Sequence, residues 1–251
     1  MKLLSLARDL KRRKARDREG VFVVEGIRAV EELLRSPLTV RGLLVAPKLI
    51  DSPRGAALVE AAKAKGVDVT DVDERDFRSA AETESPQGIV AIAETPKRSM
   101  SALATTGAMR LLLLDAVQDP GNVGTIIRTA AALGADATIA LPGTVDVWNA
   151  KVVRSAMGAH FHHPAFHASW EDVESFLSST STPLWAADAG GERVPNKAPA
   201  RLALAVGNEG GGLSTAVRSA AARVVSLPIA NTVESLNVAV ATGIILHELR
   251  P

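Results

Sequence analysis

Residues 111–128 read Leu111-Leu-Leu-Leu-Asp-Ala-Val-Gln-Asp-Pro-Gly-Asn-Val-Gly-Thr-Ile-Ile-Arg128. An uninterrupted apolar run gives way here to a turn and then to a helical pattern, as in a buried parallel strand followed by a helix. Similar junctions occur at Gly207-Asn-Glu-Gly-Gly-Gly-Leu-Ser214 and at Leu227-Pro-Ile-Ala-Asn-Thr-Val-Glu-Ser-Leu-Asn237. Because α/β folds bind ligands at the carboxyl edge of the sheet, we expect the three segments to form one composite site.

The C-terminal half contains further runs of the same kind. Continuous apolar segments predict strands at 111–114, 137–141, 184–187, 202–206 and 224–227. Helical patterns lie near 123–133, 149–158, 170–178, 214–222 and 235–249. The last helix is apolar on nearly all sides, so we expect it to be covered all round, by its own chain or by a partner subunit.

The N-terminal half alternates between helical and strand patterns on a smaller scale. Helices are expected at 2–16, 26–35 and 54–65, and strands at 21–24, 42–46, 67–70 and 88–93. This rhythm indicates a small α/β domain. Residues 95–109 are polar, small and aperiodic, which is typical of a linker. The expected organisation is therefore a domain at 1–94, a linker at 95–109 and a second domain at 110–251.

The composition excludes several classes of protein. Of the 251 residues, 47% are hydrophobic and 23% are charged, as in soluble globular proteins. No run reaches the roughly 18 apolar residues of a membrane-spanning helix, and the first residues become charged too early for a secretory signal. Cysteine is absent, which excludes disulfides and thiolate chemistry. We expect no membrane association and a cytoplasmic location.

Positive charge is concentrated at the start of the chain. The formal net charge is +1, yet residues 1–18 contain eight basic and two acidic side chains. Such an arm suits an anionic partner such as nucleic acid, although a solvated basic helix has the same pattern. Since aromatic residues make up only 3%, recognition of a nucleic acid is expected to depend on charge and shape more than on stacking. The candidate RNA-binding residues are Arg12, Arg13, Lys14, Arg16 and Arg18.

Polar residues at the first junction are candidates for a site, and each also has an ordinary structural explanation. Asn122 stands before a helical pattern and is expected to be its N-cap. Arg128 falls about one and a half turns into that helix, where it is either a functional guanidinium or a surface ion-pair partner. Its apolar neighbours indicate that the guanidinium projects from a largely buried helix, and the pattern alone leaves both interpretations open.

The glycine-rich turn at 207–214 does not match the common phosphate-binding loops. It lacks the Gly-x-Gly-x-x-Gly spacing of a dinucleotide site, and the chain has no Gly-Lys-Ser or Gly-Lys-Thr of a P-loop. Glu209 is either a solvated turn residue or part of a site, and Ser214 is a natural N-cap for the following helix.

The third junction leads into the last helix. Ser235 is expected to be the N-cap, and Asn237 then falls inside the helix, where asparagine is unfavourable. Polar side chains at a helix N-terminus suit a ligand carboxylate or another anion. The third junction is therefore a candidate ligand site.

The histidine-rich stretch His160-Phe-His-His-Pro-Ala-Phe-His167 contains residue types that bind metals. On a strand, His160 and His162 would share one face, as two zinc ligands do. No third ligand follows at a suitable spacing, so we expect no bound metal.

Together the three junctions resemble the three motifs of the SpoU/TrmH family of RNA ribose 2′-O-methyltransferases, within the SPOUT superfamily. Asn122 and Arg128 match the family's Asn, five residues, Arg; Gly207-x-Glu209-Gly and Ser235-Leu-Asn-Val238 match the other two motifs. The resemblance implies catalytic roles for Arg128, Asn122, Glu209, Ser235 and Asn237. It implies that S-adenosylmethionine is the cofactor and that Gly207, Leu227, Ile229 and Leu236 bind it.

Other segments extend this resemblance over most of the chain. Arg154-Ser-Ala-Met-Gly-Ala159 resembles the family's Arg-x-Ser-x-Gly-Ala, and the segments 19–26 and 40–45 resemble its accessory substrate-binding domain. The implied fold is an α/β protein with a C-terminal Rossmann-like parallel sheet, threaded into a trefoil knot, and a smaller N-terminal α/β RNA-binding domain. The implied assembly is a homodimer.

The function implied by the resemblance is methylation of a ribose 2′-hydroxyl in RNA, with large-subunit ribosomal RNA as the expected substrate. Because an arginine stays protonated, Arg128 is expected to position the ribose-phosphate and stabilise negative charge rather than act as a base. Two alternatives remain open: a tRNA substrate, or an inactive RNA-binding or ribosome-assembly factor.

Overall fold

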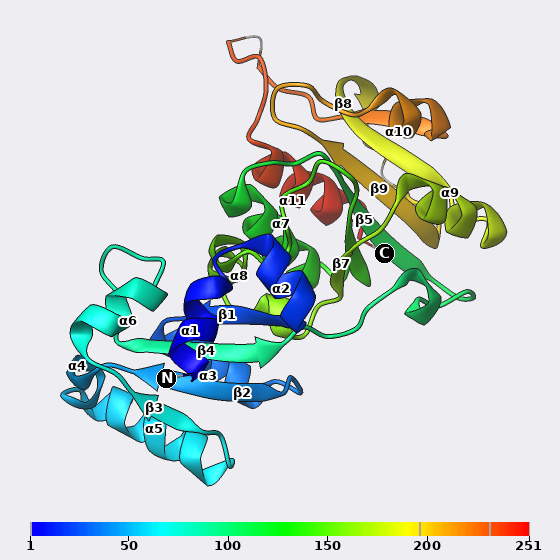
Figure 1. Cartoon of the computed structure of the whole chain (residues 1–251). Coiled ribbons are helices and arrows are strands. Elements are labelled where there is room, and N and C mark those ends of the chain that lie inside the picture. Colours follow the sequence, from blue (N-terminus) through cyan, green and yellow to red (C-terminus); the bar gives the residue numbers. More distant parts are fainter. Residues whose placement is uncertain (1, 196, 231, 251) are drawn as a thin grey trace. The chain divides into compact units, whose positions relative to one another are not determined.

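The computed structural model describes residues 2–195, 197–230 and 232–250, which form two compact units (Figure 1). Unit 1 contains the residues up to 97 together with 148–162, and unit 2 contains 98–147 together with the residues from 163 onward. The chain thus passes between units within the expected linker. The segment 148–162 groups by its contacts with unit 1, although we expected it in the domain 110–251.

Unit 1 is built on a four-stranded mixed sheet. Its strands are β1 (Val21–Glu25), β2 (Val40–Val45), β3 (Val69–Asp71) and β4 (Ile89–Glu94). They lie in the order β1-β4-β2-β3, with β4 antiparallel to both of its neighbours and β3 parallel to β2. All five residues of β1 are buried, so helices must cover both faces of this sheet.

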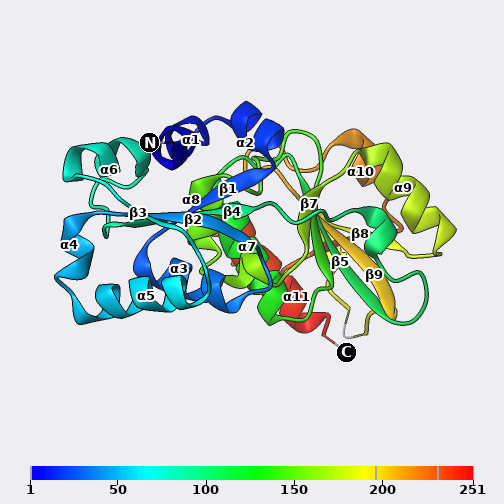
Figure 2. The same ribbon diagram turned by 60° about the horizontal axis from the view of Figure 1, so that its bottom comes forward.

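Helices cover both faces of the unit 1 sheet, with α1 and α6 on one face and α3 and α5 on the other (Figure 2). The helices are α1 (Lys2–Asp9), α2 (Arg13–Glu19), α3 (Ile27–Arg35), α4 (Pro47–Ile50), α5 (Pro53–Ala64), α6 (Glu74–Ala80), α8 (Ala150–Ser155) and the 3₁₀ turn η2 (Ala159–Phe161). Helix α6, capped by Asp73, was not expected from the sequence.

The single basic helix expected at 2–16 is wrong, because the chain turns between α1 and α2. Leu10 is buried at this turn, and Arg12 is extended at the start of α2. The guanidinium of Arg16 donates to the carbonyl oxygens of Leu10 (2.7 Å) and Lys11 (3.1 Å). These bonds satisfy the carbonyl groups that a continuous helix would have paired.

Unit 2 contains a six-stranded sheet in which every described pair of strands is parallel. The strands are β5 (Met109–Asp115), β6 (Ala137–Ala140), β7 (Ala165–His167), β8 (Leu184–Arg193), β9 (Arg201–Gly207) and β10 (Arg223–Ser226), in the order β10-β8-β9-β5-β6-β7. The Rossmann-like parallel sheet is therefore confirmed, whereas the trefoil knot stays a prediction.

Helices pack on both faces of the unit 2 sheet, as Figures 1 and 2 show. They are α7 (Pro120–Ala132), α9 (Trp170–Ser179), α10 (Thr215–Ala220), α11 (Val238–Glu248) and the 3₁₀ turn η1 (Met100–Ala102). Leu111 and Leu113 of β5 share a core with α9 and α10, and α7 packs against α11. Neighbouring side chains on a strand face opposite sides, so the run Leu111–Leu114 of β5 contributes apolar side chains to both faces of the sheet.

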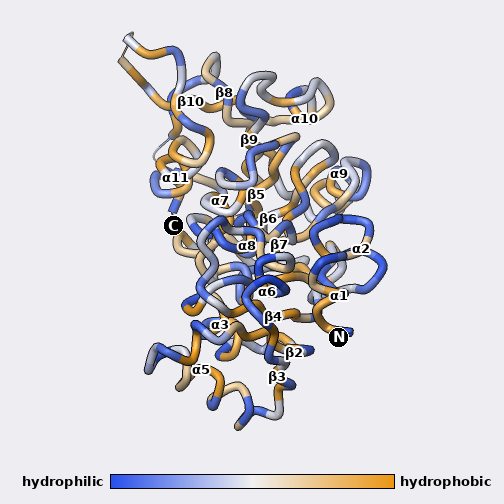
Figure 3. The backbone as a smooth tube through the Cα atoms, turned by 60° about the vertical axis from the view of Figure 1, so that its left-hand side comes forward, coloured by the Kyte–Doolittle hydropathy of each residue, from blue (hydrophilic) through white to orange (hydrophobic). Residues whose placement is uncertain are grey.

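Helix α11 differs from its expected form. It begins at Val238 rather than near Ser235, and its own chain covers only part of it. Val240 is 52% exposed and Ile244 is 39% exposed. The helix is largely hydrophobic, in contrast to the hydrophilic α2 (Figure 3). No helix in the described part of the chain is long and apolar enough to cross a membrane.

Candidate ligand cleft and catalytic cluster

The glycine-rich turn is fixed to the edge of the parallel sheet by two side chains that sequence analysis missed. The buried carboxylate of Asp115, the last residue of β5, accepts a hydrogen bond from Ser214 N at 2.6 Å. Asn208 donates to Ala116 O at 2.9 Å and accepts from the N–H groups of Gly210 and Gly211. The signal for both was their position at a strand end, where polar residues meet a loop.

Gly207 is required by close contact between backbone segments. Asn208 and Gly212 exchange two backbone hydrogen bonds, of 2.9 and 3.0 Å, which fold the turn back over Gly207. A Cβ at position 207 would lie 2.3 Å from the carbonyl carbon of Gly212. No side chain fits there, because the backbone of Gly212 fills that space, so the turn can close over the strand end only with glycine at position 207.

Three of the five expected catalytic residues form one hydrogen-bonded cluster. Asn237 Nδ2 donates to Asn122 Oδ1 at 3.0 Å, and Asn122 Nδ2 donates to Glu209 Oε1 at 3.0 Å. The three residues come from three separate junctions of the sequence. The expectation that these junctions meet is therefore confirmed for Asn122, Glu209 and Asn237.

The caps of the two helices differ from those expected. Asp119, not Asn122, caps α7, because its Oδ1 accepts from Asn122 N at 2.7 Å. Asn237, not Ser235, caps α11, with Oδ1 accepting from Ala239 N at 2.9 Å and from Val240 N at 3.3 Å. Pro120 after Asp119 is the signal that identifies the first cap. Asn122 is thus left free to bridge the other two residues of the cluster.

The cluster keeps Glu209 ionised. Burial by itself raises the pKa of this carboxyl, but the hydrogen bond from Asn122 and those from backbone N–H groups, including Gln118, outweigh it and hold the pKa below its ordinary value. The Gln118 contact is long, at 3.5 Å. Glu209 therefore presents a negative charge at the edge of the sheet.

A cleft of about 740 Å³ opens beside this cluster, within unit 2. Its walls are residues 187–189 in the middle of β8, the end of β9 at 206–207, the turn after β9, the segment 225–229 and the start of α11. The lining includes all four expected cofactor residues and three of the expected catalytic ones: Gly207, Leu227, Ile229, Leu236, Glu209, Ser235 and Asn237. One wall is apolar and the other carries amide and carboxylate groups, as in sites for amphipathic small molecules.

Arg128 lies apart from this cleft. It is exposed on α7 and does not line the 740 Å³ cleft. Among the described residues it forms no hydrogen bond or ion pair. Its guanidinium is therefore available to a molecule outside the chain, and a catalytic role for Arg128 stays a prediction.

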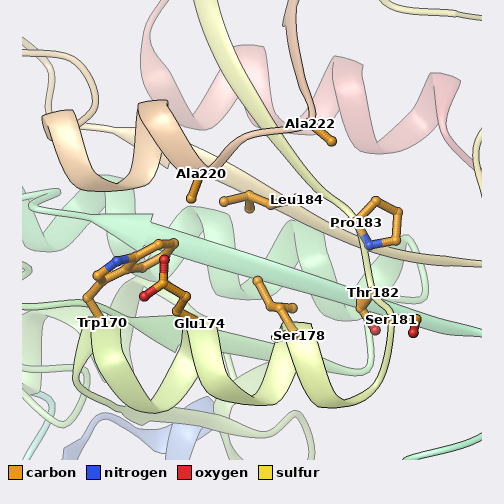
Figure 4. A pocket seen from close by; sticks show the side chains of 10 residues that line it. Trp170, Glu174, Ser178, Ser181, Thr182, Pro183, Leu184, Ala220 and Ala222 are labelled. Carbon is orange, nitrogen blue, oxygen red and sulfur yellow. The ribbon is translucent and has the colours of Figure 1, made fainter.

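A second cleft in unit 2, of about 510 Å³, lies between α9 and the edge of β8 (Figure 4). Trp170 and Glu174 of α9 line it on one side, with Leu184 and Ala220 across from them. Glu174 is its one ionisable side chain. This cleft lacks the grouped polar side chains of a catalytic site.

The histidine-rich segment is not the strand that was considered. His160 is buried in η2, with its ring edge against Trp148 at a centroid distance of 4.2 Å. In unit 2, His163 is buried and bonded to Thr138 Oγ1 at 2.8 Å. The described residues contain no group of three His, Cys, Asp or Glu side chains able to hold a metal ion.

One of the expected RNA-binding residues has a structural role. Arg16 is only 6% exposed, and its guanidinium is bonded within the turn between α1 and α2. The expectation of RNA contact at Arg16 is therefore wrong. The other four residues are exposed, and Arg12 and Arg18 also pair with Asp9 and Glu19.

A parallel sheet with helices on both faces and a cleft at its carboxyl edge defines an α/β protein that binds a small molecule at the strand ends. Residues 109–247 match the SpoU rRNA Methylase family, and residues 5–91 match the MRM3-like substrate binding domain. The chain therefore belongs to the SpoU rRNA methylase family and is an RNA methyltransferase.

Several relatives cover most of the chain. It is 36% identical over 245 residues to the 23S rRNA (guanosine(2553)-2′-O)-methyltransferase RlmP of Bacillus subtilis (strain 168). The aligned region covers 95% of this chain and 92% of RlmP. The human mitochondrial rRNA methyltransferase 3 is 32% identical over 183 residues, which cover 70% of this chain and 42% of that protein. The structure of the SpoU methyltransferase AviRb from Streptomyces viridochromogenes in complex with AdoMet matches with a TM-score of 0.88 and 28% identity, covering 98% and 96% of the two chains.

Proposed function

We propose that this protein transfers a methyl group from S-adenosylmethionine to a ribose 2′-hydroxyl of ribosomal RNA, in the large subunit. The observation that carries the proposal is the Glu209–Asn122–Asn237 cluster at the edge of a half-apolar cleft. The relatives support ribosomal RNA as the class of substrate, because RlmP is named a 23S rRNA 2′-O-methyltransferase. The AdoMet complex of AviRb supports the cofactor.

The cleft fits S-adenosylmethionine by shape and chemistry. Gly207 lines the cleft, and the turn that closes over it would bring backbone groups to a bound ligand. Leu227, Ile229 and Leu236 would supply apolar surface for the adenosine, and the Glu209 carboxylate would supply a negative charge to the cationic cofactor. S-adenosylmethionine contributes an activated methyl group on a sulfonium.

The chain's own residues then have to align the hydroxyl and stabilise charge. A ribose hydroxyl is a weak nucleophile, so fixed orientation supplies much of the rate. The cluster holds Asn122 and Asn237 in one orientation, and Glu209 stays ionised. Arg128, exposed and without a partner among the described residues, is assigned to the ribose-phosphate of the RNA.

The proposed assembly is a homodimer through α11. Val240 and Ile244 on this helix, together with Val233 and Leu236, form an exposed apolar strip. Exposed apolar patches of several hundred Å² are uncommon on monomers. Light scattering is expected to give twice the chain mass of 26.3 kDa. A stable monomer with full activity would contradict the dimer.

Calorimetry and an Arg128→Ala variant test the proposed function. The wild type should bind S-adenosylmethionine or S-adenosylhomocysteine without added metal. It should bind both of them more tightly than NADH or ATP. Arg128→Ala should reduce methyl transfer to RNA by orders of magnitude with little change in cofactor affinity. A fully active Arg128→Ala variant would exclude the role given to this residue.

A further inference from the structure

Unit 1 contains a cleft that the proposed methyl transfer does not use. Its volume is about 610 Å³, within the range of about 300–1,000 Å³ typical of small-molecule sites. The start of α3, the loop 83–87 and the end of α8 form its walls. It is rich in charge, since its lining includes Arg28, Arg35, Arg54, Arg154, Glu25, Glu31 and Glu32.

The three carboxylates of this cleft are already engaged. Arg54 donates two hydrogen bonds to Glu31, at 2.7 and 2.5 Å, and Arg35 pairs with Glu32 at 2.7 Å. Glu25 is buried and accepts from Thr83 Oγ1 and from Glu82 N, the latter at 2.9 Å. These pairs build the walls of the cleft and leave little negative charge free within it.

Two arginines of the cleft, Arg28 and Arg154, are not bonded to a carboxylate, although Arg28 adds to the effect of Arg54 in lowering the pKa of Glu31. Neither Arg28 nor Arg154 forms a hydrogen bond or ion pair with another described residue. Arg154 Nη1 is shielded from solvent and lacks an acceptor among them. A buried guanidinium N–H without an acceptor is unusual in folded proteins, and the planar guanidinium group matches the oxygens of a phosphate.

An apolar surface lies next to these charges. Met157 lines the same cleft, is 53% exposed, and has a left-handed backbone with φ of 51°. Methionine contacts flat aromatic rings favourably through its sulfur. The cleft therefore offers two cationic groups and one apolar group side by side, which suits a nucleotide.

We propose that this cleft binds one nucleotide of the RNA substrate, with its phosphate on Arg28 and Arg154 and its base against Met157. The inference rests on the proposed function, because it takes RNA as the substrate. It gives the Arg154–Ala159 segment a role in unit 1, where its contacts group it. This RNA contact is separate from the basic arm at residues 1–18.

The test compares two double variants in the full-length protein. Arg28→Gln/Arg154→Gln removes the two cleft charges, and Arg75→Gln/Arg78→Gln removes two exposed charges of α6, outside the cleft. Binding of a fluorescein-labelled single-stranded oligoribonucleotide is measured against salt concentration. Loss of the one phosphate contact should reduce the slope of log K against log salt by about 0.7 for the cleft variant, and by less for the α6 variant.

Further measurements keep the proposal testable. Because Arg28 is exposed, Arg28→Gln alone should fold normally, even if the Arg154 variant is unstable. It should weaken RNA binding and lower the slope of log K against log salt, by at most about 0.7. Equal slopes for the cleft variant and the α6 variant would overturn the proposal. If the wild type transfers no methyl group to RNA, the proposed function fails; if it does, and the cleft variants keep wild-type RNA affinity, only the cleft is excluded.

Discussion

Asn237 has two tasks, and two substitutions separate them. Its Oδ1 caps α11, and its Nδ2 donates to Asn122, which in turn donates to Glu209. Asn237→Asp keeps the acceptor that caps the helix and removes the donor. Asn237→Ala removes both. The structure therefore predicts different stabilities and similarly low activities for the two variants.

The stability change follows from the cap. Loss of an asparagine N-cap costs about 1 kcal/mol, which lowers the melting temperature of a chain of this size by roughly 2–4 °C. Asn237→Ala loses both the cap and the hydrogen bond to Asn122, whereas Asn237→Asp keeps the cap and loses only that bond. Asn237→Asp should therefore be about 1 kcal/mol more stable than Asn237→Ala. Ser169→Ala is the matched control, because it removes the N-cap of α9 away from the cluster.

The activity change follows from the cluster. In Asn237→Asp, a carboxylate oxygen faces Asn122 Oδ1, so two acceptors meet. Asn122 cannot relieve this by turning its amide, because its oxygen would then face the Glu209 carboxylate. Loss of one such hydrogen bond costs about 1 to 1.5 kcal/mol in the folded state. We expect the misaligned cluster to raise the barrier by a similar amount, which is roughly tenfold in rate.

Thermal unfolding and methyl transfer from labelled S-adenosylmethionine measure the two effects. Both Asn237 variants should lose activity about tenfold, while Ser169→Ala keeps it. An Asn237→Asp variant as unstable as Asn237→Ala would refute the cap assignment. Full activity in both Asn237 variants would refute the role of the cluster.

Three further predictions concern other parts of the chain. Gly207→Ala should abolish cofactor binding in calorimetry, because its Cβ would meet the Gly212 backbone at 2.3 Å, whereas Gly210→Ala, with its nearest atom at 3.7 Å, should retain it. Burial, aided by Arg98, lowers the pKa of His163 from 6.5 to about 4, so stability should fall by up to about 3 kcal/mol as pH decreases through this window, when only the unfolded chain takes up the proton. In urea unfolding, His163→Gln should show a flatter pH dependence; an unchanged one would exclude this assignment. Lys14→Gln should weaken RNA binding without affecting stability, whereas Arg16→Gln should lower the melting temperature, and the reverse pattern would contradict the burial of Arg16.

The strands of unit 2 were predictable because their signal is local. A strand buried on both faces is apolar at every position, and 111–114 and 202–206 have this pattern. The meeting of the three junctions was predictable for the same reason, since parallel strands place their carboxyl ends at one edge. The chemical roles of those residues could not be predicted from the strand pattern, because they were inferred from the family resemblance and from side-chain geometry.

Other features depend on contacts between residues far apart in sequence. The cap of α11 was misplaced because Ser235 and Asn237 are both good N-caps, and only the bonds to Ala239 and Val240 decide between them. The break between α1 and α2 has no glycine or proline to mark it. The grouping of 148–162 with unit 1 has no local signal, because it is set by tertiary contacts.

The most direct test of the central claim is a map of ribose methylation in ribosomal RNA from cells with and without the gene. Our account predicts that one 2′-O-methyl group of the large-subunit RNA is absent without the gene. It should return when the purified protein and S-adenosylmethionine are added to that RNA, but not with the Arg128→Ala variant. An identical methylation map in both cells, with no transfer to RNA by the purified protein, would contradict the account.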